Sequence, residues 1–126
     1  MPSPRGPEGR RARLPRSARL LSQAQFDRVY KQGRKLVAPG VVAWALPSGT
    51  AGSRLGLSVS RKVGGAIQRN RVKRVLREAF RQIETPPDPP LDLVLVARPG
   101  RAPQTLADAR DTLQLLLRRW QPPAGR

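Results

Sequence analysis

The feature that most constrains the fold is a long amphipathic segment in the middle of the chain. Between residues 66 and 83, apolar side chains recur in steps of three and one, which places them on one face of an α-helix. The members of this face are Val72, Val75, Leu76, Ala79, Phe80 and Ile83. Such a helix needs a partner to cover its apolar face, because packing supplies most helical stability. The prolines of residues 85–90 end the helix.

Three apolar segments predict the sheet on which this helix packs. Residues 41–46 form an apolar run, and residues 54–62 alternate apolar and polar side chains, as a half-buried strand does. Residues 91–97 are almost entirely apolar, which is typical of a strand buried on both faces. We expect the first two strands to pair as a hairpin.

Two further helices complete the predicted domain. A capping box of Ser22 and Gln25 begins a short helix. Thr105 begins the last helix, whose apolar stripe extends to Trp120. The order helix, strand, strand, helix, strand, helix predicts an α+β fold, an α/β sandwich with one central sheet, over residues 19–120.

The two ends of the chain differ from this domain in composition. Residues 1–18 are rich in Pro, Gly and Arg and predict a flexible basic arm, while residues 121–126 predict a tail. The N-terminus lacks the apolar core of a secretory signal, although its basic, acid-poor composition also suits a transit peptide. We expect a cytoplasmic protein without a membrane partner, since no apolar run approaches the length of a membrane span.

The charged residues restrict the function. A net charge of +17 favours a polyanionic partner, and nucleic acid, an anionic membrane surface and an acidic protein all satisfy that charge. The chain has no Cys and no His, so it lacks thiolates and the commonest general base and metal ligand. No two acidic residues form a pair suited to metal or acid–base catalysis: Glu8, Asp27, Glu78, Glu84, Asp88, Asp92, Asp108 and Asp111. We therefore expect neither catalytic nor metal-binding residues.

Basic side chains share the face of the 66–83 helix that lies opposite its apolar face. On a helical wheel, a sector roughly 100° wide contains Asn70, Lys73, Arg74, Arg77 and Arg81. Arg69 lies at one edge of this sector and Arg71 on the other flank. Groups four residues apart are about 6 Å apart along the axis, near the spacing of nucleic-acid phosphates. A merely solvated basic face is the alternative, but the density of like charges favours a bound polyanion.

The stretch GLSVSRKVGGAIQRNRVKRVLREAFR resembles the signature of the bacterial ribonuclease P protein family, which is centred on an Arg-Asn-Arg motif. The upstream block Phe26-x-x-Val29-Tyr30-x-x-Gly33 and the downstream LVLVARPG are also similar, so the resemblance covers roughly residues 14 to 120. The family usually has Gly-Asn before the helix where this chain has Gly64-Gly65. A side-chain contribution of that asparagine to capping or contact is then missing.

The resemblance implies a fold, a function and two binding surfaces. The fold is an αβββαβα sandwich related to the second domain of ribosomal protein S5. The function is that of the protein subunit of ribonuclease P, whose catalytic RNA removes the 5′ leader of precursor transfer RNA with Mg²⁺ bound mainly through the RNA. One protein pairs with one RNA, and further dimerisation is left open. The resemblance implies that the RNA subunit contacts Arg69, Asn70, Arg71, Lys73, Arg74 and Arg77. The cleft for the leader is then lined by Phe26, Tyr30, Trp44, Ser58, Ser60, Arg61 and Lys62.

Other interpretations of the same residues stay open at this point. Phe26 suits a helix staple and Trp44 a core position, while Ser58 and Ser60 suit ordinary solvent-facing serines. A structural ribosomal-RNA-binding protein of similar fold is the alternative function. An autonomous nuclease is disfavoured because the chain lacks histidine and a carboxylate cluster.

Overall fold

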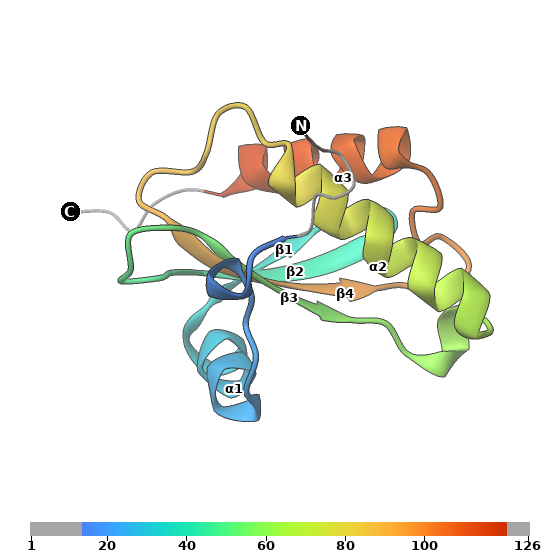
Figure 1. Ribbon diagram of the computed structural model, residues 1–126, viewed down its shortest axis with the longest axis horizontal. Coiled ribbons are helices and arrows are strands. Elements are labelled where there is room, and N and C mark those ends of the chain that lie inside the picture. The colour runs from blue at the N-terminus through green and yellow to red at the C-terminus, as the bar shows by residue number, and fades with distance from the viewer. Residues whose placement is uncertain (1–13, 121–126) are drawn as a thin grey trace, which may run out of the picture.

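A four-stranded sheet lies between one helix on its first face and two helices on its second, in a computed structural model that describes residues 14–120 (Figure 1). In chain order, with η denoting a 3-10 helix, the elements are η1 (Arg16–Ala18), α1 (Gln23–Gln32), β1 (Arg34–Val37), β2 (Val41–Pro47), β3 (Arg54–Ser58), η2 (Arg61–Val63), α2 (Ala66–Arg81), β4 (Leu91–Ala97) and α3 (Leu106–Arg119). The α+β sandwich and the αβββαβα order that the resemblance implies are confirmed. Within the described residues, no helix is both long and apolar enough to cross a bilayer.

The strand order is β1-β2-β4-β3, with β3 parallel to β4 and the other neighbours antiparallel. The expected hairpin between residues 41–46 and 54–62 is wrong, because β4 lies between β2 and β3. An almost wholly apolar strand is best placed at the centre of a sheet that is covered on both faces, and β4 takes that position. The short edge strand β1 was missed, because Leu36 is its only buried residue.

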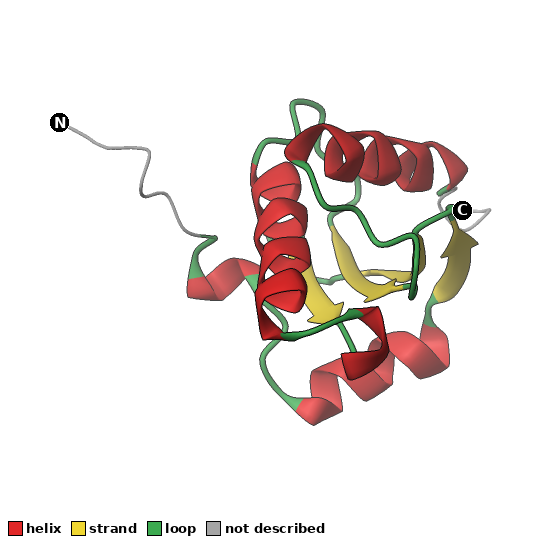
Figure 2. Ribbon diagram, turned by 90° about the vertical axis from the view of Figure 1, so that its right-hand side faces the viewer, coloured by secondary structure: helices red, strands yellow, loops and turns green. Residues whose placement is uncertain are grey.

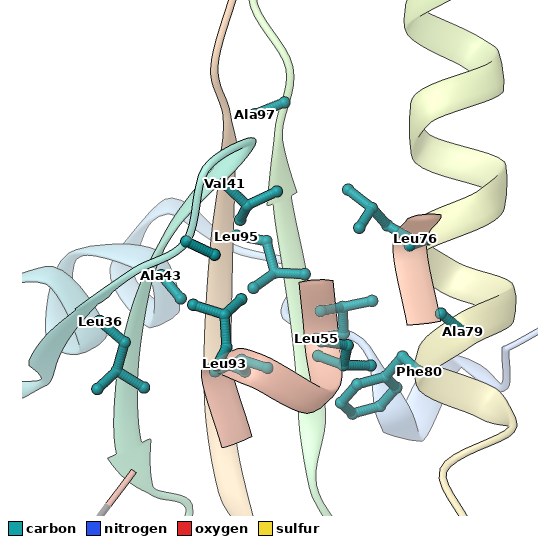
Figure 3. Packing of buried hydrophobic residues seen from close by; sticks show 14 of the residues in the cluster. Leu36, Val41, Ala43, Leu55, Leu76, Ala79, Phe80, Leu93, Leu95 and Ala97 are labelled. Carbon is teal, nitrogen blue, oxygen red and sulfur yellow. The ribbon is translucent and has the colours of Figure 1, made fainter. Parts of the chain in front are cut away.

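Alternation along the strands divides the buried residues between the two faces. The larger cluster joins one side of the sheet to α2 and α3 and includes Leu55, Leu76, Phe80 and Leu93 (Figure 3). Figure 2 shows α3 along the top of the strands, α2 along their left side and α1 below them. The smaller cluster lies under α1 and has Leu20, Val29 and Val94 as its buried members.

The capping predictions are confirmed at both outer helices. The Ser22 hydroxyl accepts a hydrogen bond from the Gln25 amide at 3.2 Å, and the Gln25 side chain accepts from the Ser22 amide at 3.1 Å. The Thr105 hydroxyl accepts from the amide of Asp108 at 3.1 Å. At the start of α2, Gly65 makes no side-chain cap, as expected where glycine replaces asparagine.

The boundary of the predicted basic arm is wrong by several residues. Leu14 is buried in the larger cluster, and η1 follows it immediately. The backbone then joins the sheet, since the Leu20 amide donates to the Leu55 carbonyl at 3.0 Å. Residues 14–18 therefore belong to the domain, because a leucine among the arginines supplies an apolar anchor. The rest of the predicted arm and the tail 121–126 lie outside the described residues.

Candidate nucleic-acid interface

The side of the sheet that faces α1 is built in rows of residues paired across β2, β4 and β3. The first row, as we name it, is Leu46, Asp92 and Arg54. The middle row is Trp44, Val94 and Gly56. The outer row is Val42, Val96 and Ser58. α1 covers the first two rows, in which Asp92 and Val94 are fully buried, and the half-buried outer row forms the floor of the candidate leader cleft beside α1.

Three aromatic residues meet over the middle row. The Phe26 and Tyr30 rings, one helical turn apart on α1, have centroids 6.5 Å apart. The Tyr30 ring meets Trp44 edge-on, with centroids 5.2 Å apart and an interplanar angle of 81°. All three side chains are half-buried, so they pack on the smaller cluster and also keep exposed edges. We call this set, Phe26, Tyr30 and Trp44, the aromatic ladder.

A glycine allows the ladder to sit close to the sheet. A Cβ built at Gly56 would lie 2.7 Å from Cζ of Phe26 and 3.2 Å from Cδ1 of Leu20. Real side chains do not approach so closely, so the Phe26 ring rests directly on the backbone of β3. On the same face of the sheet, Lys35 of β1 is paired with Trp44, and its ammonium lies 5.9 Å from the Trp44 ring centroid, a cation–π distance.

The outer row combines one predicted residue with two that sequence reasoning missed. Ser58 is half-buried and forms a side-chain hydrogen bond with Tyr30. Burial raises the pKa of the Tyr30 phenol, the bond to Ser58 lowers it, and the charge of Asp27 raises it. Val42 and Val96 are half-buried and give the floor an apolar surface. In the sequence, both valines alternate with residues that point into the core. An apolar strand alone does not reveal which of its two faces is covered by a helix and which stays accessible to solvent.

The remaining predicted cleft residues lie beyond the end of β3. The strand ends at Ser58, so the predicted strand over residues 54–62 is too long. The Ser60 hydroxyl instead accepts a hydrogen bond from the Lys62 amide at 3.3 Å and caps η2. Ser60, Arg61 and Lys62 are exposed. They occupy the connection between the floor of the cleft and α2.

The second candidate surface is the basic face of α2. The helix buries Val72, Val75, Leu76, Ala79 and Phe80 against the larger cluster. None of its predicted RNA contacts is buried. Four are exposed, namely Asn70, Arg71, Arg74 and Arg77, and two are half-buried, namely Arg69 and Lys73. Burial of one face fixes the orientation of the other, so this basic face is rigidly presented.

Acidic residues are almost absent from both surfaces. The sequence contains no Asp or Glu between Asp27 and Glu78. Glu78 pairs with Arg81, three residues further along α2. Arg81 lowers the pKa of the Glu78 carboxyl, chiefly through that hydrogen bond. Among residues 14–120, no group of three acidic side chains is placed to hold a metal ion.

The two surfaces lie on opposite faces of the sheet and are joined by the edge strand β3. One side of β3 supplies Gly56 and Ser58 to the cleft, and its end leads through η2 into α2. Figure 1 shows α1 below the strands and α2 above them, with the η2 connection at one end. A bound molecule in the cleft and another on α2 would therefore not compete for the same residues.

Known proteins resemble this chain in sequence and in structure. The Ribonuclease P family model matches residues 14–121. A ribonuclease P protein component of Brevibacillus brevis is 40% identical over 105 residues, which cover 82% of this chain and 83% of that protein. The RNase P protein from Thermotoga maritima has a TM-score of 0.72 at 31% identity, over 82% of this chain and 97% of that one. The RNase P protein of Staphylococcus aureus has a TM-score of 0.71 at 29% identity, over 80% and 93%.

Proposed function

Because the chain belongs to the ribonuclease P protein family, and so is a subunit of a tRNA-processing enzyme that partners the ribonuclease P RNA, we propose that its two surfaces bind two different RNAs. In this proposal the cleft between α1 and the sheet holds the single-stranded 5′ leader of precursor transfer RNA. The basic face of α2 contacts the ribonuclease P RNA.

The chemistry of the cleft supports a single-stranded ligand. Proteins hold unpaired bases by stacking them on aromatic rings and by placing cations along the backbone. Here the aromatic ladder offers exposed ring edges above an apolar floor, and Arg61 and Lys62 are exposed at the end of β3. Bases would lie against the ladder and the outer row, while phosphates would face the two cations.

The basic face of α2 suits a folded RNA. Arginine and lysine groups spaced along a rigid helix match phosphates and displace their counterions. Arg69, Lys73 and Arg77 follow one another at intervals of four residues. The apolar back of α2 is buried, so the helix does not have to become ordered when RNA binds.

Catalysis is assigned to the RNA subunit in this proposal. Of the acidic side chains near the two surfaces, Asp92 is fully buried against arginines and Glu78 is paired with Arg81. The protein would increase affinity for substrate and for Mg²⁺ held by the RNA, because its cations reduce the repulsion between phosphates. We place this activity in the cytoplasm, with one protein for each RNA.

The observation that carries the proposal is the presence of an aromatic cleft and a basic helix on opposite faces of one sheet. Reconstitution with a bacterial ribonuclease P RNA tests it. The protein is expected to stimulate cleavage of precursor transfer RNA at low Mg²⁺ concentration and to favour substrates with a leader over mature transfer RNA. No stimulation would contradict the proposal. Tight RNA binding without any leader preference would favour the structural ribosomal-RNA-binding alternative.

A further inference from the structure

A fully buried carboxylate lies in the first row beneath α1. Asp92, in the central strand β4, has no exposed surface. Arg54 donates to it through Nε at 2.8 Å to Oδ1 and through Nη2 at 2.7 Å to Oδ2. Arg28 of α1 donates through Nη1 to Oδ2 at 3.0 Å, and its Nη2 donates to the Pro47 carbonyl at 3.4 Å.

The second arginine is not needed to neutralise the buried charge. A buried carboxylate requires a partner, and Arg54 on the neighbouring strand already binds both oxygens of Asp92. The carboxylate raises the pKa of the Arg54 guanidinium, chiefly through these hydrogen bonds. Arg28 therefore adds a second cation to a pair that is complete without it. Its side chain is 41% exposed, whereas that of Arg54 is 19% exposed.

The position of Arg28 on α1 shows what this extra contact does. Val29 is the only fully buried residue of α1, and the half-buried Phe26 and Tyr30 supply its other apolar contacts with the sheet. On a helical wheel Phe26 and Tyr30 share one flank, and Arg28 lies roughly 160–200° from them. The aromatic rings therefore contact the sheet from one side of Val29 and Arg28 contacts it from the other. These two attachments oppose rotation of the helix about its own axis.

We propose that Arg28 is a positioning residue for the leader, which acts by fixing the rotation of α1 and thereby the aromatic ladder. This inference rests on the proposed binding of the leader in the cleft. Rotation of α1 moves Phe26 relative to Gly56 and Tyr30 relative to Trp44, so a loosened helix presents a less ordered stacking surface. Arg28 acts through the ladder and does not itself contact the leader phosphates.

The test uses the variant Arg28→Met, which keeps most of the length of the side chain but removes both hydrogen bonds. The control variant is Lys31→Met. Lys31 is exposed on the same helix and matches the change in charge. The holoenzyme with Arg28→Met is expected to bind leader-bearing precursor about fivefold to tenfold more weakly, a fraction of one stacking interaction. Its affinity for mature transfer RNA and its salt dependence should remain unchanged.

A measurement on the free protein tests the same inference without RNA. In a Trp120→Phe background, Trp44 is the only tryptophan, and its fluorescence reports contact with Tyr30. The spectrum should change with Arg28→Met and not with Lys31→Met. Arg28→Lys retains one cationic donor for Asp92. It should therefore show a smaller loss of affinity for leader-bearing precursor and a smaller change in Trp44 fluorescence than Arg28→Met. Urea unfolding confirms that each variant is folded, and Asp92 keeps Arg54 in all of them.

Three outcomes would overturn the inference. Equal losses with and without a leader would mean that Arg28 acts elsewhere. A decrease of about one unit in the salt slope would indicate a direct phosphate contact. Unchanged Trp44 fluorescence would show that α1 does not depend on Arg28 for its position. If the unmodified protein shows no leader preference, the proposed function fails instead, and the fluorescence result still decides the role of Arg28.

Discussion

The ring of Phe26 rests on Gly56, so closely that a Cβ at Gly56 would lie 2.7 Å from the Cζ atom of the ring. This contact joins α1 to the edge strand β3 and sets the height of the aromatic ladder above the sheet. It makes a glycine in the middle of a strand part of the candidate cleft, although glycine normally weakens a strand.

Adding one methyl group at this contact should destabilise the protein. Gly56→Ala forces the Phe26 ring to move, and such overpacking costs about 1–3 kcal/mol. Urea unfolding measures the loss, with Gly52→Ala as the control, because a Cβ at Gly52 meets nothing within 4 Å. Phe26→Ala should relieve the clash, so the double variant should be less destabilised than the sum of the single ones. Additive losses would contradict the contact.

Removing the ring itself should weaken leader binding specifically. Phe26→Ala is expected to cost about 1–3 kcal/mol in affinity for leader-bearing precursor if the ring stacks on a base. The measurement is the dissociation constant of the holoenzyme for precursor and for mature transfer RNA. A loss of equal size for both substrates would point to a folding defect and against stacking.

Neutralising single residues on the basic face should change the salt dependence of RNA binding. Arg69→Ala and Lys73→Ala should each weaken binding to the ribonuclease P RNA and reduce the slope of log affinity against log salt by about one unit. Arg118→Ala is the matched control, since Arg118 is an exposed arginine on α3. An unchanged slope for Arg69→Ala and Lys73→Ala would mean that these groups are only solvated.

Alkaline titration should report the environment of Tyr30 directly. Tyr30 is the only tyrosine, so the ultraviolet absorbance of phenolate follows this group alone. Its pKa should exceed 10.0, because burial raises it more than the bond to Ser58 lowers it. Ser58→Ala should raise the pKa further. Since the folded pKa exceeds the unfolded one, the contribution of Tyr30 to stability is complete below about pH 10 and is lost at higher pH. A pKa at or below 10 in the folded protein would contradict this environment.

Acid should remove a small contribution from the pair on α2. Arg81 lowers the pKa of Glu78 below 4.5, so the pair stabilises the fold above that pH and the contribution is lost as pH falls through the folded pKa. Glu78→Gln should therefore lose less stability than the unmodified chain between neutral and acidic pH. The difference should be under about 1 kcal/mol, because both side chains are partly exposed. Urea midpoints across this pH range measure it, and parallel curves would show that the pair contributes nothing.

Local signals predicted the elements well, but not which strands are neighbours. The caps at Ser22 and Thr105 and the apolar face of α2 depend on residues a few positions apart, and all were predicted from the sequence. The place of β4 between β2 and β3 depends on contacts between distant segments. Neighbouring strands in sequence usually pair, so the expected hairpin followed the commoner arrangement.

In the candidate site, too, features set by nearby residues were predicted from the sequence, and contacts between distant segments were not. Helical spacing revealed that the basic residues of α2 share one face. The aromatic ladder was expected only from the family resemblance, because the contact between Tyr30 and Trp44 joins a helix to a strand. Asp92 was considered only as an acid unsuited to catalysis. Its link to Arg28, 64 positions away in the sequence, has no local pattern by which it could be recognised.

The central place of β4 also dictates when the domain can form during synthesis. Until residues 91–97 have left the ribosome, β1 and β2 can pair only with each other, and β3 can bond only to the backbone at Arg19 and Leu20. By then α2 has been synthesised, but the sheet on which its apolar face packs is incomplete. Most of the sheet must therefore close in one late step across distant segments, which is the kind of step that slows folding and leaves apolar surface open to aggregation.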